Sequence, residues 1–590
     1  MPFVSRIDRG KSRSRQIAAL NRREIVAARL SRREMAKLGL LTSAGYLVAQ
    51  HGLSARASGG GPESPPTTPW ELPLSIPPVK TPVPTLTPQW TTAPNTAAGE
   101  GRTRAHQATG LFPPALLYEV HQRAEQKSVH PDLPLQTLWT FDGHVPGPTY
   151  HAYYGQPILV RNVNDLPADN GGFGLPSVST HLHNGHTPSE SDGFPCDFFE
   201  RGQFYDHHYP NVLAGALSTH PPDGDLNESM STLWYHDHRV DHTAENVYKG
   251  LAGFYLLFNQ HDTGDEGTGF RLPSGEFDVP MIFTDRVFDQ DTGLLAFDLM
   301  NEDGILGDKF LVNGRIQPFF QVKRRRYRFR WLDGGPSRFY QFHLTNPSSL
   351  GTVYPFWQIS NDGNLLPAPI QVSNVRLSVA ERADVIIDFS QFPAGSTIYL
   401  ENRLEQDDGR GPDGDVLPAG QGNYLLRFDI LPDSVTDGSA HPSTQQFYAL
   451  PSTTATPRVT RTFRFERTNG QWAINGKFFS CNDVRFRVQK NSVERWILQN
   501  SSGGWMHPIH IHFEEFQILK SNGSAIPAGS VLKSRKDVMR LEHNHQVELF
   551  FRFRDFEGRY PMHCHNTLHE DHAMMLRWDI DATGDTKTNP

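Results

Sequence analysis

Short stretches in which hydrophobic and polar residues alternate occur along the chain from about residue 105 to its end. A period of two places apolar side chains on one face of an extended segment, so each stretch predicts a half-buried β-strand. Examples are 327–331, 463–466 and 548–553, together with the apolar run 158–160 that follows a turn-rich segment at 141–148. Repeated strands of this kind are typical of β-sandwiches.

Length and composition favour the same fold class. The chain has 590 residues, which is too many for one hydrophobic core, and its 50 Gly and 45 Pro indicate many turns. We expect an all-β protein built from roughly three or four β-sandwich domains.

The first 57 residues have the layout of an export signal. Arg32-Arg33 precedes an apolar run from Leu38 to Ala49, and Ala55-Arg56-Ala57 has the small-x-small form of a cleavage site. This order resembles a twin-arginine signal, which predicts use of the twin-arginine export machinery and a periplasmic or extracellular location. The apolar run has 12 residues, fewer than the roughly 20 that span a bilayer, so we expect no membrane insertion.

A proline-rich arm follows the signal at 58–104. Eleven prolines between residues 62 and 94 exclude a helix and predict extended chain. The arm is either a loose linker or a segment that lies along the folded body, which its apolar residues would favour; these are Leu72, Leu74, Ile76, Val79 and Val83.

Charge excludes two classes of partner. Residues 1–57 hold 12 Lys and Arg against 3 Asp and Glu, so residues 58–590 hold 44 against 61, a net charge of −17. Such an acidic chain repels nucleic acid and anionic lipid, and we expect neither as a partner. We expect a monomer.

Histidine is distributed unevenly along the chain. Residues 271–440 contain only His343, whereas the segments on either side contain histidine clusters. Side chains two residues apart on a strand point to the same face, so a His-x-His pair offers two imidazoles to one side. Histidine is the commonest metal ligand. A pair at His543/His545 lies in a polar turn, and we interpret it as unrelated to metal binding. Four pairs lie among apolar strand residues: His181/His183, His236/His238, His510/His512 and His563/His565.

The chain has three cysteines, and Cys564 lies inside the last histidine pair. On a strand its side chain points to the face opposite the two histidines, so the thiolate and the imidazoles can serve two different metal sites. Together with His507, His569 and Met574 it offers two imidazoles, a thiolate and a thioether, the set that suits electron-transfer copper. Met575 is a rival axial ligand, and only the spacing favours Met574.

The other two cysteines, Cys196 and Cys481, could pair after export or remain buried thiols. The sequence leaves both alternatives open.

Four motifs resemble the copper signatures of three-domain multicopper oxidases, in the family's order. They are His181-Leu182-His183, Trp234-Tyr235-His236-Asp237-His238, His507-Pro508-x-His510-x-His512 and His563-Cys564-His565 followed by His569 and Met574. Within the family the likeness is to the bilirubin-oxidase and spore-coat-laccase type, although Asn184 replaces a common glycine. The resemblance implies three cupredoxin-like Greek-key domains, at 105–262, 263–445 and 446–590, and four copper ions per chain.

The resemblance also implies a role for each site residue. His507, Cys564, His569 and Met574 would bind type 1 copper. Type 2 copper would be bound by His181 and His510, and the type 3 pair by His183, His236, His238, His512, His563 and His565.

Three further residues have two interpretations each. Asp192 and Glu570 resemble the family's proton-relay carboxylates, but they could be a turn-capping aspartate and a surface glutamate. Trp505 could line the donor pocket or pack in the core.

The implied activity is oxidation of a reducing small molecule at type 1 copper, coupled to reduction of dioxygen to water at the other three ions. Phenols, aromatic amines or tetrapyrroles are the expected donors. The alternative is a metal oxidase acting on Mn(II) or Cu(I), for which Glu514, Glu515 and Asp571 offer carboxylates. A copper-free structural relative is disfavoured because the ligand set is complete.

Overall fold

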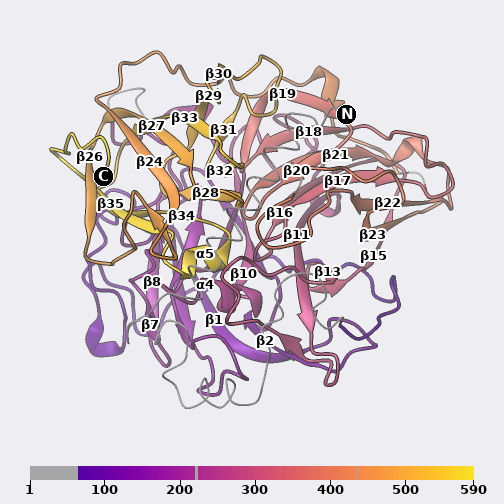
Figure 1. Cartoon of the computed structure of the whole chain (residues 1–590), viewed down its shortest axis with the longest axis horizontal. Helices are drawn as coiled ribbons and strands as arrows, with labels where there is room; N and C mark the ends of the chain where they lie inside the picture. The colour runs from indigo at the N-terminus through magenta and orange to yellow at the C-terminus, as the bar shows by residue number, and fades with distance from the viewer. Residues whose placement is uncertain (1–63, 219–223, 413, 434) are drawn as a thin grey trace, which may run out of the picture.

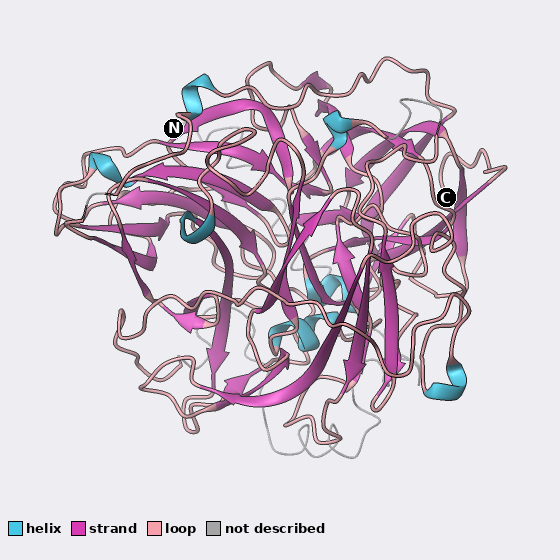
Figure 2. Ribbon diagram, turned by 180° about the vertical axis from the view of Figure 1, so that it is seen from behind, coloured by secondary structure: helices cyan, strands magenta, loops and turns pink. Residues whose placement is uncertain are grey.

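The computed structural model describes residues 64–218, 224–412, 414–433 and 435–590. Its regular structure is strand with a few short helices (Figure 2), which confirms the all-β prediction. Within the described ranges no helix is long and apolar enough to cross a membrane. The predicted export signal at 1–57 lies outside the described residues.

The first pair of sheets has the strand orders β2-β1-β4-β8 and β3-β10-β9-β6. Trp139, Phe141 and Tyr235 belong to the apolar core between them. The strands are β1 Leu116–Lys127, β2 Gln136–Phe141, β3 Gly147–Tyr153, β4 Ile158–Asn164, β6 Thr180–His183, β8 Phe204–Tyr209, β9 Thr232–Asp237 and β10 Ala252–Phe258, beside a small sheet of β5 Ser177–Val178 and β7 Phe199–Glu200.

The middle pair of sheets has the orders β14-β13-β11-β16-β21-β18-β19, with β12 beside β11, and β15-β23-β22-β17-β20. Its strands are β11 Asp278–Phe288, β12 Leu295–Ala296, β13 Lys309–Val312, β14 Arg315–Ile316, β15 Phe319–Val322, β16 Arg326–Asp333, β17 Tyr340–Thr345, β18 Phe356–Asn361, β19 Asn364–Val372, β20 Val375–Leu377, β21 Arg382–Asp388, β22 Thr397–Asn402 and β23 Asn423–Ile430.

The third pair has the orders β25-β24-β27-β33-β29-β30, with β31 beside β29, and β26-β35-β34-β28-β32. Its strands are β24 Val459–Thr468, β25 Gln471–Ile474, β26 Val484–Gln489, β27 Ser492–Asn500, β28 His507–Ile511, β29 Phe516–Ser521, β30 Ser524–Ala525, β31 Arg535–Lys536, β32 Val538–Leu541, β33 Gln546–Phe553, β34 Gly558–Cys564 and β35 Met575–Asp581.

The three pairs of sheets share one topology. Each large sheet contains one parallel strand pair among antiparallel neighbours: β1 with β4, β3 with β10, β11 with β16, β15 with β23, β24 with β27, and β26 with β35. The same sandwich is therefore built three times along the chain. Figure 1 shows the first in indigo to magenta, the middle in pink and the third in orange to yellow, with α4 (Thr243–Tyr248) and α5 (Thr567–Asp571) close together at the centre.

The strands predicted from alternation are present as β16, β24 and β33, and the strand predicted from the apolar run at 158–160 is present as β4. β16 is not half-buried, because the side chains of Arg328 and Arg330 are as inaccessible to solvent as those of the apolar residues that follow each of them, Phe329 and Trp331. Arg328 lies 3.0 Å from Asp262 and 2.6 Å from Asp384, so its charge is paired inside the contact between the first two domains. The alternating pattern predicted the strand, whereas its burial is possible because the arginine charges are paired with carboxylates.

From residue 64 onward the proline-rich arm lies along the folded body, which confirms the second of its two interpretations. The amide of Leu74 donates to Phe319 of the middle domain, and those of Lys80 and Val83 donate to Thr149 and Leu117 of the first. The arm therefore spans two domains.

Candidate metal centre

Two strand pairs bring the histidine motifs together. β6 and β9 are antiparallel neighbours with His181 opposite His236, and β28 and β34 are neighbours with His510 opposite His563. His183 ends β6, while His238, His512 and His565 stand just beyond the ends of β9, β28 and β34. The first and third domains each contribute four imidazoles, all of them buried.

The ring nitrogens of this eight-histidine cluster converge in three sets. Nε2 of His238 lies 3.2 Å from Nε2 of both His512 and His563. Nδ1 of His183 lies 3.4 Å from Nε2 of His236, and the His236 and His565 rings are 5.3 Å apart. Nε2 of His181 lies 3.4 Å from Nε2 of His510. Among the described histidines, nitrogens close enough to share one ion form three overlapping groups, and the His565 ring lies beside that of His236 outside these groups. The groups are His238/His512/His563, His181/His183/His236 and His181/His510/His512.

The outer nitrogens of several rings are held by neighbouring carbonyls. Nδ1 of His236 lies 2.8 Å from the oxygen of Asp237, and Nδ1 of His510 lies 3.1 Å from that of Asp537. These contacts favour the tautomer whose Nε2 lone pair points inward, as in metal-bound histidine. Burial lowers the pKa of His236 to about 3, which keeps the ring neutral.

The arrangement of these ring nitrogens suits metal binding better than direct contact between the rings. Inward lone pairs at 3.2–3.4 Å repel unless a cation lies between them. Among the described residues neither ring nitrogen of the buried His565 has a hydrogen-bond partner. Each of the three sets can hold a metal ion.

A second donor set surrounds Cys564. Its Sγ lies 3.4 Å from Nδ1 of His507 and 3.6 Å from Nδ1 of His569, and these nitrogens are 3.1 Å apart. His569 is carried by α5, which begins after Asn566, whose side chain accepts from the amide of Leu568. The soft thiolate and two imidazoles match the donor set expected for electron-transfer copper.

The two candidate axial methionines pack in different places, Met574 inside the third domain and Met575 where the first and third domains meet. Met574 is inaccessible and packs in the core cluster that contains Cys564. Met575 packs instead with Phe194 and Phe479. Packing therefore favours Met574, as the spacing did.

Both predicted relay carboxylates lie against the histidine cluster. Oδ2 of Asp192 is 2.8 Å from Nδ1 of His512, and its backbone oxygen faces Nδ1 of His181. Burial raises the pKa of the Asp192 carboxyl well above its usual value. The Glu570 carboxylate is 3.0 Å from Nδ1 of both His238 and His563 and is buried.

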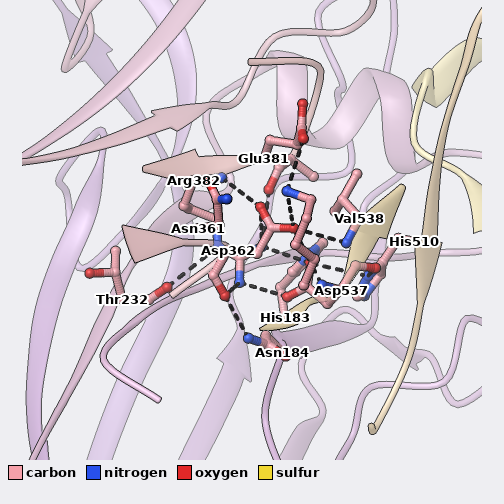
Figure 3. Close-up of polar contacts among 12 residues, drawn as sticks. His183, Asn184, Thr232, Asn361, Asp362, Glu381, Arg382, His510, Asp537 and Val538 are labelled. Carbon is pink, nitrogen blue, oxygen red and sulfur yellow. Dashed lines mark hydrogen bonds and ion pairs between the residues drawn. The ribbon is translucent and has the colours of Figure 1, made fainter. Parts of the chain in front are cut away.

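A third carboxylate, Asp537, lies at the cluster and was not predicted from the sequence. Its Oδ1 lies 3.2 Å from Nε2 of His183, and Arg382 of the middle domain contacts both of its oxygens at 2.8 and 2.6 Å (Figure 3). Asp362 accepts from the amide of Val538 in the same network (Figure 3). Nothing local in the sequence marks Asp537, because the partners of its carboxylate, His183 and Arg382, are distant along the chain.

Asn184, the departure from the family's first motif, has a positive φ of 69°. This left-handed conformation suits glycine and is tolerated by asparagine, so the loop keeps its turn. Its side chain also donates to the carbonyl of Asp362 (Figure 3).

Trp505 lies inside the third domain, and none of its surface is accessible. Its ring lies 5.1 Å from that of Trp472, which itself lies 4.0 Å from the His569 ring. Trp472 was another residue that the sequence analysis missed. The structure therefore places two indoles beside the Cys564 set.

The carboxylates considered for metal oxidation are engaged elsewhere. Glu514 accepts from the amide of Arg554, and Glu515 pairs with Arg535 at 2.6 Å. Asp571 accepts from the amides of Thr243 and Ala244 at the start of α4. The structure gives no support to the metal-oxidase alternative from these residues.

Contacts in the structure also show the state of Cys196 and Cys481 and the surroundings of His545. Cys196 and Cys481 form a disulfide between the first and third domains, with Cα atoms 6.1 Å apart. His545 contacts the Ser521 hydroxyl at 2.7 Å and lies outside every candidate metal group among the described residues.

Comparison with known proteins agrees with this geometry. Residues 452–583 match the family model described as multicopper oxidase. The chain is 36% identical over 479 residues to bilirubin oxidase of Albifimbria verrucaria, covering 79% of this chain and 77% of that protein. It is 31% identical to a laccase of Bacillus stratosphericus, covering 78% of this chain and 94% of the relative.

Solved structures show the same fold at lower identity. A laccase from Pediococcus acidilactici superposes with a TM-score of 0.67 at 23% identity, covering 89% of this chain and 96% of that one. McoA multicopper oxidase from Aquifex aeolicus gives a TM-score of 0.66, also at 23% identity, over 80% of this chain and 97% of that one. With paired histidine sets, a Cys564 site and relatives of this identity, the chain belongs to the multicopper oxidase family.

Proposed function

We propose that this copper-dependent oxidase takes single electrons from phenols, aromatic amines or tetrapyrroles and reduces dioxygen to water. One observation carries the proposal: the three residues 563–565 contribute Cys564 to one donor set and two histidines to the other. The proposed occupancy is four copper ions, with type 1 at His507, Cys564, His569 and Met574, and type 2 and the type 3 pair in the eight-histidine cluster.

Copper in these two sets would supply one-electron chemistry at the sulfur site and oxygen chemistry at the imidazole site. The chain supplies the connection between them. Cys564 is joined covalently to His563 and His565, and its carbonyl lies 3.2 Å from Nδ1 of His563. An electron that enters at the thiolate therefore has a short bonded path to the cluster.

Reduction of dioxygen to two waters consumes four protons, and the cluster is buried. Asp192 and Glu570 are buried carboxylates in contact with its histidines, and we assign them to proton transfer. Burial raises the pKa of the Asp192 carboxyl, so Asp192 can hold a proton near the reacting centre. For Glu570, burial is outweighed by contacts with His563 and His238, which lower the pKa of its carboxyl group, so the carboxylate can accept a proton.

The donor class rests on two supports. The two relatives described above are named bilirubin oxidase and laccase, and Glu514, Glu515 and Asp571 are engaged elsewhere. The test is steady-state oxygen uptake by the copper-loaded protein with a dimethoxyphenol, an aromatic amine, bilirubin, Mn(II) and Cu(I). We expect turnover with organic donors, and turnover with the metal ions alone would refute this donor class.

We also propose that the protein is exported through the twin-arginine route to the periplasm or beyond. The Cys196–Cys481 disulfide supports an oxidising compartment. Replacing Arg32-Arg33 with Lys-Lys should leave the precursor inside the cell, and undiminished export of that variant would contradict the assignment.

A further inference from the structure

A tight hairpin places one arginine beside the Cys564 site. β24 and β25 are joined by Asn469 and Gly470, whose φ values of 51° and 79° fit a two-residue turn of the I′ type. The register sets Arg467 directly opposite Trp472. The guanidinium carbon of Arg467 lies 4.0 Å from the centre of the indole, a cation–π contact.

Trp472 connects this arginine with a predicted copper ligand. Its ring lies 4.0 Å from the ring of His569 and 5.2 Å from that of His507. The indole N–H donates to the carbonyl of Glu302 at 3.1 Å, and Nε2 of His569 lies 3.0 Å from the carbonyl of Asp303. Two consecutive carbonyls of the middle domain thus fix the orientation of both rings.

The charge of Arg467 is buried close to this site. Its side chain is 2% exposed, and it pairs with the Glu302 carboxylate, which is 3.4 Å away and 17% exposed. A charge screened by protein rather than water acts on its neighbours more strongly than a surface charge does. Positive charge from Arg467 therefore acts on His569 and His507 through the intervening indole.

We propose that Arg467, held against Trp472, raises the reduction potential of the Cys564 site and so helps decide which donors can reduce it. The inference rests on the proposed ligand set. Reduction lowers the positive charge of the site by one, so a nearby cation destabilises the oxidised form more than the reduced form. Glu302 has the opposite sign and should lower the potential.

The test uses four variants of the copper-loaded protein. Arg467→Gln removes the charge and Arg467→Lys retains it. Glu302→Gln removes the opposing charge. Arg464→Gln removes an arginine from the same strand whose side chain is 54% exposed, and it serves as the matched control. Redox titration of the blue absorption gives the potential, while copper analysis and thermal unfolding show that each variant is folded and loaded.

For Arg467→Gln we expect a lower potential, equivalent to about a tenfold change in the electron-transfer equilibrium with a donor, or ~59 mV. Arg467→Lys should retain most of the parent value, and Arg464→Gln should not differ from the parent. Glu302→Gln should move the potential upward. Potential shifts of opposite sign in Arg467→Gln and Glu302→Gln would not arise if each substitution merely disturbed the structure of the site.

An unshifted potential in Arg467→Gln, or shifts of the same sign in Arg467→Gln and Glu302→Gln, would overturn the inference. If Arg467→Gln does not fold, the sign of the Glu302→Gln shift still decides. A parent holoenzyme without a blue band that depends on Cys564 would overturn the ligand assignment as well. The two failures are therefore distinguishable.

Discussion

Cys564 is the one cysteine outside the disulfide, and its sulfur faces His507 and His569. Cys564→Ser should abolish the intense absorption near ~600 nm and donor oxidation, because thiolate-to-copper charge transfer gives such sites their colour. Copper should remain in the histidine cluster. Absorption spectra and copper analysis check this, with Cys196→Ser/Cys481→Ser as a blue control; a blue Cys564→Ser protein would contradict the assignment.

Asp192 tests the proton route. Asp192→Asn is nearly isosteric, so copper content, blue colour and donor reduction should be normal, while reoxidation by dioxygen slows. Its pH optimum should move to lower values, because more abundant solvent protons then compensate for the missing carboxyl group. Stopped-flow reoxidation from acid to neutral pH measures this. The control is Glu190→Gln, a buried carboxylate two residues away, and a parental Asp192→Asn rate would refute the role.

Asp537 ties the histidine cluster to Arg382. Asp537→Asn should lower the free energy of unfolding by about 3–5 kcal/mol, because it removes the charge paired with the buried Arg382 at 2.6 Å and leaves the more distant Asp362 carboxylate at 4.0 Å. It should also reduce copper content, because Asp537 contacts His183. Asp285→Asn breaks the buried pair with Arg338 and is the matched control. Equal copper content in both variants would make Asp537 a purely structural residue.

At this scale the sequence predicted the residues whose signal is local. The spacing of His563, Cys564 and His565 determines which face each side chain takes. The structure brings His563 and Cys564 to candidate metal groups and the His565 ring within 5.3 Å of the His236 ring. Asp537 and Trp472 could not be found, because their roles depend on contacts with the middle domain. For Trp505 the sequence left pocket and core open, since burial depends on the surrounding fold.

Among the elements, the proline-rich arm offers a direct test of its packing. Leu74 is 7% exposed and belongs to the core of the middle domain, whereas Ile76 is 48% exposed. Leu74→Ala should lower the free energy of unfolding by about 2–5 kcal/mol, and Ile76→Ala should change it by less than ~0.5 kcal/mol. Denaturant unfolding measures both, and equal effects would mean that the arm is not anchored through Leu74.

Element type followed from the sequence where alternation was clear, as in β24, whose burial alternates along its length. Burial of β16 did not, because Arg328 and Arg330 are paired with aspartates on neighbouring segments. A period of two reports the strand conformation. Which charged faces are covered is decided by the domain contact, which the local pattern does not contain.

At the scale of the molecule, three domains with copper chemistry on the first and third agree with the distribution of histidines. The middle domain contributes to both donor sets, since it supplies Arg382 to Asp537 and the carbonyl of Asp303 to His569. Those contacts join segments 155 or more residues apart along the chain. No spacing within a motif could have predicted them.

The disulfide is the covalent tie between the outer domains. Cys196→Ser/Cys481→Ser should lower the free energy of unfolding by about 2–4 kcal/mol, because the unfolded chain regains freedom. Blue colour and oxygen uptake should persist, because neither cysteine belongs to a candidate metal group. Calorimetry with and without reductant checks this. Reductant should lower the unfolding temperature of the parent only, and equal effects on both proteins would refute this account.

Backbone and disulfide together make a closed ring that contains the entire middle domain, because the two cysteines are 285 residues apart. A single cut by a protease anywhere between 263 and 445 would open the ring without releasing a piece. His181, His183, His236 and His238 would remain on one fragment and the other predicted ligands on its sulfur-linked partner. Nicked molecules should therefore run as one band until they are reduced, and they should stay blue for as long as the cut halves remain packed.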